Sequence, residues 1–175
     1  RHRPEVIGIE LDAEGWVPVE ELLARAAEAG RNIDRATLVR VVQENDKQRF
    51  TLSADGARIR AAQGHSVDVD LGLEAVEPPE TLFHGTATRN LASIREHGLL
   101  PGNRQHVHLS LDEGTSRKVG TRHGKPVVLR VAARAMHEAG QTFHVSENGV
   151  WLPLTVAAEF ITFPESGQDR DEIPR

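Results

Sequence analysis

The stretch RFTLSADGARIRAAQGHS, residues 49–66, decides the fold of the first half of the chain. Apolar and polar residues alternate in residues 48–53 and again in 57–62, which is the period of a β-strand. The turn signal Ala-Asp-Gly between them predicts a β-hairpin. The stretch also carries Arg49, Arg58, Arg60 and His65, and RHRPE at residues 1–5 repeats the pairing of arginine with histidine. Guanidinium groups gathered in this way favour an anionic ligand.

Two helices are predicted upstream of this hairpin. In residues 15–30, Pro18 suits a first helical turn, apolar residues recur at helical spacing, and Gly30 can end the helix. In residues 32–46, Asn32 or Asp34 can cap the start. Two helices followed by a two-stranded wing predict a winged-helix lobe. Such lobes often touch nucleic acid, but many serve as protein scaffolds.

The composition changes in residues 66–82, SVDVDLGLEAVEPPETL. This stretch is acidic and lacks helical periodicity, and Pro78 and Pro79 predict a stiff, extended entry into a second unit. We place the domain boundary near Leu73, with one lobe in residues 1–73 and another in residues 74–175.

Short strands dominate the second half. Strands are predicted in residues 81–86, 106–110, 126–133, 142–145, 150–154 and 159–163. A helix is predicted in residues 88–98, with Thr88 as its cap and Gly98 at its end, and a helical turn in residues 134–140. A solvated loop is the ordinary interpretation of residues 116–125. The predicted fold class is therefore α+β.

The overall composition excludes several classes of protein. The net charge of −5 argues against a protein that coats nucleic acid through charge alone. The absence of cysteine excludes disulfides and thiolate metal sites. No apolar run suits a transmembrane helix, and no signal peptide precedes the first folded segment. We expect a cytoplasmic protein with no membrane partner, and the abrupt start predicts residues upstream of Arg1.

Arginine makes up 18 of the 21 basic residues. Codon bias in a GC-rich genome explains this as well as any function does. The alternative is that some arginines bind phosphate as bidentate forks, a role that lysine does not imitate.

The sequence FHGT contains the first candidate ligand site of the second half. Gly85 would let a ligand approach the backbone closely, because it has no side chain. His84 and Thr86 could then hydrogen-bond a ribose hydroxyl. His-Gly pairs also occur by chance in many turns, so the motif alone is weak.

A metal site is the obvious alternative for His106 and His108, which point to the same face if residues 106–110 form a strand. No matching third ligand accompanies them in the sequence, and no His-Glu-x-x-His pattern is present. We therefore expect no bound metal. A plain strand with hydrogen-bonded histidines is as compatible with the pattern as a ligand-binding role.

Two further stretches contain candidate residues. Gly120 and Gly124 bracket Arg122, which permits a tight turn that could direct its guanidinium inward. In SENGVWLP, Glu147 could act as an acid or base, but a glutamate in a turn is usually solvated. Trp151 suits a core position better than a stacking platform.

Seven motifs occur in order along the chain: RHRPE, GWVPVEELL, RFTLSADGARIRAAQGHS, LFHGT, HVHLS, VGTRHGKPVVLRV and FHVSENGVWL. Together they resemble the RNA 2′-phosphotransferase family over nearly the whole chain. The resemblance implies a winged-helix lobe followed by a lobe like the ADP-ribosyltransferases.

The resemblance also implies roles for individual residues. A catalytic tetrad would consist of Arg1, His2, Arg49 and Arg122. The residues implied to bind NAD⁺ are His84, Gly85, Thr86, His108 and Ser110. The strand that carries a catalytic glutamate in many ADP-ribosyltransferases reads Val150-Trp151 here, so Glu147 is not given that role.

The reaction that the resemblance implies removes the 2′-phosphate that some ligases leave at a tRNA splice junction. The phosphate is transferred to ADP-ribose derived from NAD⁺, through an ADP-ribosylated RNA intermediate. The products would be 2′-OH RNA, ADP-ribose 1″,2″-cyclic phosphate and nicotinamide. We expect a monomer that uses no metal. Two alternatives are an ADP-ribosyltransferase that caps nucleic-acid 5′-phosphate ends and a non-catalytic winged-helix protein that senses NAD⁺.

Overall fold

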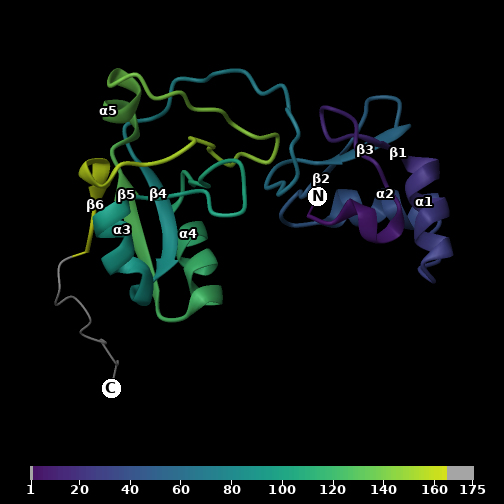
Figure 1. Cartoon of the computed structure of the whole chain (residues 1–175), viewed down its shortest axis with the longest axis horizontal. Helices are drawn as coiled ribbons and strands as arrows, with labels where there is room; N and C mark the ends of the chain where they lie inside the picture. The colour runs from purple at the N-terminus through teal and green to yellow at the C-terminus, as the bar shows by residue number, and fades with distance from the viewer. Residues whose placement is uncertain (1, 165–175) are drawn as a thin grey trace. The chain divides into compact units, whose positions relative to one another are not determined.

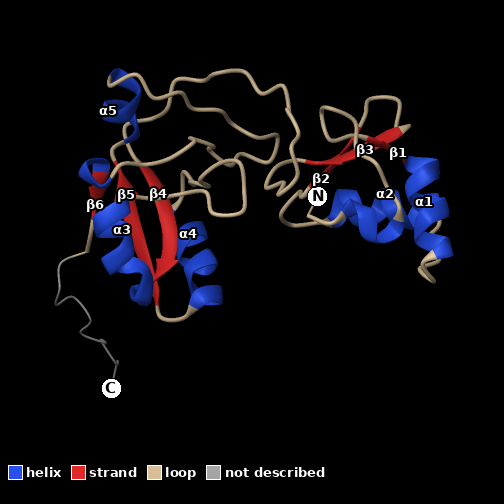
Figure 2. Ribbon diagram, viewed as in Figure 1, coloured by secondary structure: helices blue, strands red, loops and turns tan. Residues whose placement is uncertain are grey.

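The computed structural model describes residues 2–164 except the side chain of His123, so Arg1 lies outside the described residues. Helices and antiparallel sheets both contribute, and the fold class is α+β, as predicted (Figures 1 and 2). The chain divides into two units. The first unit consists of the chain up to Val76 together with Pro101–His106 and His144–Leu152. The second unit consists of Glu77–Leu100, Val107–Phe143 and the chain from Pro153. The domain boundary at Leu73 stays a prediction.

The first unit packs helices on one small antiparallel sheet. Its elements are η1 (Pro4–Ile7), β1 (Val17–Pro18), α1 (Val19–Glu28), α2 (Arg35–Glu44), β2 (Phe50–Leu52) and β3 (Arg58–Ala61). The strand order is β1-β3-β2, and Thr51 pairs with Arg60 across the hairpin. Ile9, Val17, Val19 and Ile59 form its buried core.

Local signals explain why these elements form where they do. Pro18 is the N-cap of α1, and the side chain of Asp34 caps α2 by accepting a hydrogen bond from the Thr37 amide. The hairpin turn closes at Ser53, and Gly56 there has a φ of 68°, which glycine adopts without strain. Both helices and the hairpin are confirmed.

The second unit is built around a three-stranded antiparallel sheet in the order β4-β5-β6. Leu82, Leu129 and Val131 are fully buried in it. Its elements are β4 (Leu82–Ala87), η2 (Thr88–Asn90), α3 (Leu91–His97), α4 (Glu113–Gly120), η3 (Thr121–His123), β5 (Pro126–Val131), α5 (Ala133–Glu138), η4 (Ala158–Phe160) and β6 (Ile161–Thr162).

Several predictions for the second half were wrong in detail. Residues 113–120 form the helix α4, although a loop was expected from residue 116. Thr88 does not cap a helix, because it begins η2 and α3 follows without a side-chain cap. Residues 106–110, 142–145 and 150–154 form isolated bridges instead of strands. These segments are too short to build a ladder of their own, and each pairs at one or two positions with a neighbouring segment.

Two segments from the second half of the sequence pack within the first unit. Ala75 and His144 form a bridge, and so do Val145 and Trp151. Trp151 is 8% exposed, so its predicted core position is confirmed. None of the helices in the described part of the chain is long and apolar enough to cross a membrane.

Candidate active site

β4 and the neighbouring segment bring three of the predicted NAD⁺-binding residues together. Nδ1 of His84 lies 3.0 Å from the carbonyl oxygen of His108. Phe83 and Ser110 exchange both backbone hydrogen bonds, at 2.8 and 2.9 Å. Because a carbonyl can only accept, Nδ1 of His84 carries the hydrogen, and Nε2 of the neutral ring is then the acceptor. The bond to His108 thus fixes which ring nitrogen of His84 carries the hydrogen.

Gly85 has a packing role that the sequence did not reveal. A side chain at this position would collide with the backbone of Ser116, so the glycine lets α4 lie directly on β4. The sequence predicted that a ligand would occupy this space, whereas α4 fills it in the structure. Thr86 is 5% exposed, and its hydroxyl accepts a hydrogen bond from the side-chain amide of Asn90 at 3.0 Å.

Arg122 lies in the turn that follows α4. Gly120 packs against the backbone of Thr86, since a β-carbon there would come within 2.7 Å of the Thr86 carbonyl oxygen. Gly124 closes the turn with a φ of 128°. Between the two glycines the chain forms η3, and Arg122 follows the contact with β4 by two residues. Its side chain is exposed, so the inward direction that the sequence suggested for its guanidinium is not seen.

Arg49 enters β2 directly after a strained residue. Gln48 has a φ of 41°, a left-handed conformation that residues other than glycine seldom adopt. Asn45 ends α2 and binds this turn, accepting hydrogen bonds from the amides of Lys47 and Gln48. The Arg49 carbonyl then accepts from the Ala62 amide at 3.0 Å, which extends the hairpin by one residue.

His2 also belongs to the first unit. Its Nδ1 lies 2.7 Å from Oγ of Ser66, just after the hairpin, and the side chain is exposed. Arg1, its predicted catalytic neighbour, is outside the described residues. Arg49 and Arg122 belong to different units, so their convergence on one anion stays a prediction.

The other two arginines of the hairpin have structural partners. The Arg60 side chain is 11% exposed, and its guanidinium lies 2.6 Å from the carboxylate of Glu147 and 4.5 Å above the ring of Trp16. Arg58 lies 5.2 Å from the same ring and 3.5 Å from Asp12. Glu147 and Asp12 therefore neutralise part of the positive charge of the hairpin. Arg49 is the hairpin arginine that remains a candidate for binding a phosphate.

Glu147 was expected to be solvated, and its side chain is indeed 38% exposed, but the carboxylate also lies against Arg60 of the hairpin. Burial raises the pKa of Glu147. Hydrogen bonds from the side chains of Thr51 and Arg60, together with the charge of Arg60, lower it by more than burial raises it. The pKa of Glu147 therefore lies below its ordinary value. The carboxylate is thus held ionised against the wing. No spacing in the sequence signals this contact, because Arg60 and Glu147 are 87 residues apart.

Residues 106–108 lie outside the strands, so the strand alternation that would turn the rings of His106 and His108 to one face is not present. The ring of His106 lies edge-on to that of His144, with the centroids 6.1 Å apart, whereas the His108 carbonyl binds His84. Burial and the nearby His144 lower the pKa of His106. Among the described residues, no three His, Cys, Asp or Glu side chains gather as a metal site would require.

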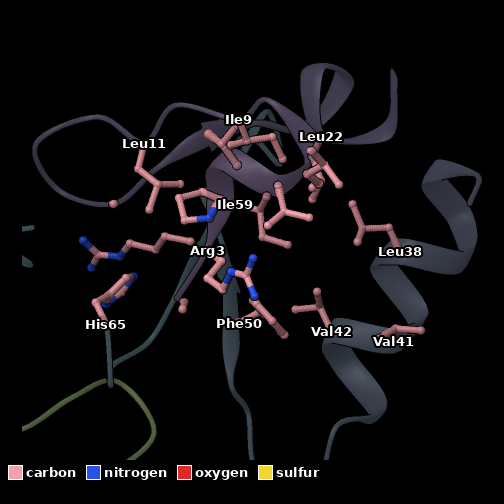
Figure 3. A pocket seen from close by; sticks show the side chains of 17 residues that line it. Arg3, Ile9, Leu11, Leu22, Leu38, Val41, Val42, Phe50, Ile59 and His65 are labelled. Atoms are coloured by element: carbon pink, nitrogen blue, oxygen red, sulfur yellow. The ribbon is translucent and has the colours of Figure 1, made fainter. Parts of the chain in front are cut away.

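The first unit also contains a cavity of about 390 Å³ beside its core (Figure 3). Arg3, Arg60 and His65 contribute polar groups, and most of the lining is apolar. A phosphate would be desolvated there without enough cations around it, so the cavity does not suit phosphate chemistry. Its apolar lining includes Ile9, Leu11, Leu22, Leu38, Val41, Val42, Phe50 and Ile59.

This chain is similar to known proteins over the whole segment that contains the candidate site residues. The family model described as RNA 2′-phosphotransferase, Tpt1 / KptA family, matches residues 1–154. Proteins named "Probable RNA 2′-phosphotransferase" are similar over 162 residues in Burkholderia lata (58% identical, 92% of this chain and 84% of the relative) and Agrobacterium fabrum (57%, 93% and 87%). The protein of the same name in Pseudomonas aeruginosa strain UCBPP-PA14 is 56% identical over 162 residues, which cover 92% of this chain and 89% of that protein.

Proposed function

The chain belongs to the RNA 2′-phosphotransferase family, a family of transferases, and we propose that it transfers an internal RNA 2′-phosphate to ADP-ribose derived from NAD⁺. The observation that carries the proposal is the family match over residues 1–154, which includes every proposed site residue. Catalysis would rest on Arg1, His2, Arg49 and Arg122.

The folds of the two units support binding of RNA by the first unit and of NAD⁺ by the second. Two helices followed by the β2–β3 hairpin favour a winged-helix lobe for RNA in the first unit. The antiparallel pair of β4 and β5, which carries His84, Gly85 and Thr86, favours an ADP-ribosyltransferase-like lobe for NAD⁺ in the second. In the neutral ring of His84, Nδ1 donates to the His108 carbonyl, so Nε2 would accept a hydrogen bond that a ribose hydroxyl donates. His108 and Ser110 adjoin it in the same unit.

In the first step, an oxygen of the RNA 2′-phosphate attacks C1″ of the nicotinamide ribose. The bond from C1″ to the nicotinamide nitrogen breaks, and neutral nicotinamide leaves with the electron pair. This step needs little acid or base, because the phosphate is already a nucleophile and nicotinamide a good leaving group. The protein's task here is to hold two anionic substrates together, which guanidinium forks accomplish by neutralising charge.

In the second step, the ribose O2″ attacks the transferred phosphorus. The bond from phosphorus to the RNA 2′-oxygen breaks, the O2″ hydroxyl loses its proton, and the RNA oxygen gains one. Charge gathers on the phosphoryl oxygens, where fixed guanidinium groups from Arg49 and Arg122 would stabilise it most. His2 titrates near neutrality as a residue type and can assist either proton movement.

Mass analysis of the products tests this proposal directly. The chain is incubated with NAD⁺ and an oligonucleotide that carries one internal 2′-phosphate. We expect 2′-OH RNA, nicotinamide and ADP-ribose 1″,2″-cyclic phosphate in equal amounts. An oligonucleotide with a 5′-phosphate and no 2′-phosphate serves as the matched control.

Three outcomes would contradict the proposal, each in favour of another function. A persistent ADP-ribosyl adduct on the 5′-phosphate, without cyclic phosphate, indicates an end-capping enzyme. Binding of NAD⁺ without nicotinamide release indicates a non-catalytic sensor. Release of inorganic phosphate from the RNA without use of NAD⁺ indicates a phosphatase.

A further inference from the structure

The turn Ser146–Gly149 contacts the chain directly before Arg49 and the hairpin after it. On one side, the side-chain amide of Asn148 donates to the Lys47 carbonyl at 3.0 Å. On the other, the Glu147 carboxylate lies 2.6 Å from the Arg60 guanidinium, and Arg60 pairs with Thr51 across the hairpin. All of these residues belong to the first unit. The residues before and after Arg49 are thus each tied to the same four-residue turn.

The strand alternation places this turn on the same face as the Arg49 side chain. Phe50 lines the apolar cavity and Leu52 packs against the core, so these two side chains point to one face of β2. Arg49 and Thr51 therefore point to the opposite face. Arg60 pairs with Thr51 and lies 2.6 Å from Glu147, which puts the turn on that opposite face with Arg49.

The bond from Asn148 acts on the strained turn that leads into the hairpin. Its acceptor is the carbonyl of the peptide that joins Lys47 to Gln48, and Gln48 has the unfavourable φ of 41°. Such a conformation persists where the surroundings hold it in place. Asn148 is one of the groups bonded to this turn, directly before Arg49.

The turn itself is internally fixed. Oγ of Ser146 lies 2.7 Å from Oδ1 of Asn148, and the Gly149 amide donates to the Ser146 carbonyl at 2.8 Å. Gly149 has a φ of 75°, which suits glycine. A turn bound to itself in this way can orient the residues that it contacts instead of following them.

We propose that Glu147 and Asn148 are positioning residues for Arg49: they hold the hairpin so that the Arg49 guanidinium meets the phosphate in a fixed direction. This inference rests on the role of Arg49 in the proposed function. It assigns to a turn near the end of the sequence a part in the chemistry of the first unit, without contact with the substrate.

The test uses Glu147→Ala, Glu147→Gln and Asn148→Ala in the full chain, with Glu20→Ala as the matched control. Glu20 forms an ion pair with Arg35, also at 2.6 Å and in the first unit, but away from Arg49. Enzyme in excess over 2′-phosphorylated RNA and NAD⁺ separates the two steps. Each variant's melting temperature is recorded, and Glu147→Gln keeps an acceptor for Arg60 if Glu147→Ala does not fold.

We expect Glu147→Ala to slow the second step about 10–100-fold, the cost of a misplaced catalytic group, and ADP-ribosylated RNA to accumulate. Asn148→Ala and Glu147→Gln should show the same accumulation to a smaller degree, and Glu20→Ala none. In an Arg49→Ala background, Glu147→Ala should change the rate less than about 2-fold, because residues that act through one another are not additive.

Equal fold-losses from Glu147→Ala in both backgrounds, or equal slowing of both steps, would overturn the positioning role and leave a general structural one. Failure of the underlying function looks different. In that case Arg49→Ala by itself leaves both steps at the rate of the unaltered chain.

Discussion

The backbone of Gly85 lies so close to Ser116 that a β-carbon on Gly85 would be 1.6 Å from the Ser116 carbonyl oxygen. No real β-carbon approaches an oxygen this closely. The strand that carries the proposed NAD⁺-binding residues and the helix that leads to Arg122 are therefore joined backbone to backbone. The position of Arg122 relative to His84 depends on this contact.

Substitution of Gly85 by alanine should destabilise the second unit. The added methyl group must push α4 away from β4, and such overpacking costs about 3 kcal/mol or more where backbone has to move. Gly114→Ala in the same helix is the matched control. The nearest atom to a β-carbon at Gly114 would be a carboxylate oxygen of Asp112 at 3.4 Å, which is a side-chain atom and not backbone. Thermal unfolding should show a large drop for Gly85→Ala and none for Gly114→Ala. Equal melting temperatures would contradict the close packing.

Substitution of His84 by alanine should weaken the binding of NAD⁺. The substitution removes a ring nitrogen that would accept a hydrogen bond from a ribose hydroxyl in the proposed function, and one such hydrogen bond corresponds to about a 2–10-fold change in Kd. His137→Ala is the control, because His137 also lies within hydrogen-bonding distance of a backbone carbonyl, that of Gln141, at 3.2 Å. Calorimetric titration with NAD⁺ measures both. An unchanged Kd for His84→Ala would remove His84 from the site.

Substitution of Arg49 or Arg122 by alanine should slow the second step more than the first. Phosphoryl charge develops in that step, and removal of one preorganised donor typically costs about 100–1,000-fold. Gel separation of RNA products over time should reveal ADP-ribosylated RNA that the unaltered chain does not accumulate. Arg31→Ala, at an exposed position after α1, is the control. Normal turnover without accumulation in either variant would contradict the assignment of that residue.

Local signals in the sequence were sufficient to predict most of the first unit. Pro18, Asp34 and Gly56 each act within a few residues, at a helix start, a cap and a turn, and the structure uses all three. Strands β4 and β5 were also predicted, in residues 81–86 and 126–133. In these segments propensity, pattern and tertiary packing agree.

The helix α4 could not be predicted, because its stability depends on packing. Its sequence EGTSRKVG combines two glycines with serine and threonine, which are weak helix formers. The helix forms because Asp112 caps it and because Gly85 and Gly120 let it pack on the sheet. The same limit applies to Glu147. Its partner Arg60 is 87 residues away in the sequence, so no local signal predicts their ion pair.

Chelation of metals should leave the activity unchanged. The proposed chemistry uses guanidinium groups where many phosphoryl-transfer enzymes use divalent cations. Turnover of 2′-phosphorylated RNA with NAD⁺ is measured with and without EDTA, and the rates should agree. The His106→Ala variant tests the remaining alternative. A loss of activity in EDTA that zinc restores in the unaltered chain but not in His106→Ala would instead indicate a metal site.

Acid should remove the contribution of Glu147 to stability. The pKa of Glu147 in the folded chain lies below its ordinary value, so its interactions stabilise the fold fully above the unfolded pKa of about 4.3 and are lost as the pH falls through the folded pKa. The side chain is 38% exposed, and solvent screening limits the effect to about 1 kcal/mol.

The unfolding free energies of the unaltered chain and of Glu147→Gln, measured by urea titration between pH 7 and pH 3, check this. Their difference should be positive and constant near neutrality and should shrink toward zero in acid, because protonated glutamate and glutamine are both neutral. A difference that grows as the pH falls would mean that burial outweighs Arg60 and Thr51 and raises the pKa of Glu147. The ion pair with Arg60 would then stabilise the turn too little to hold it against the hairpin beside Arg49.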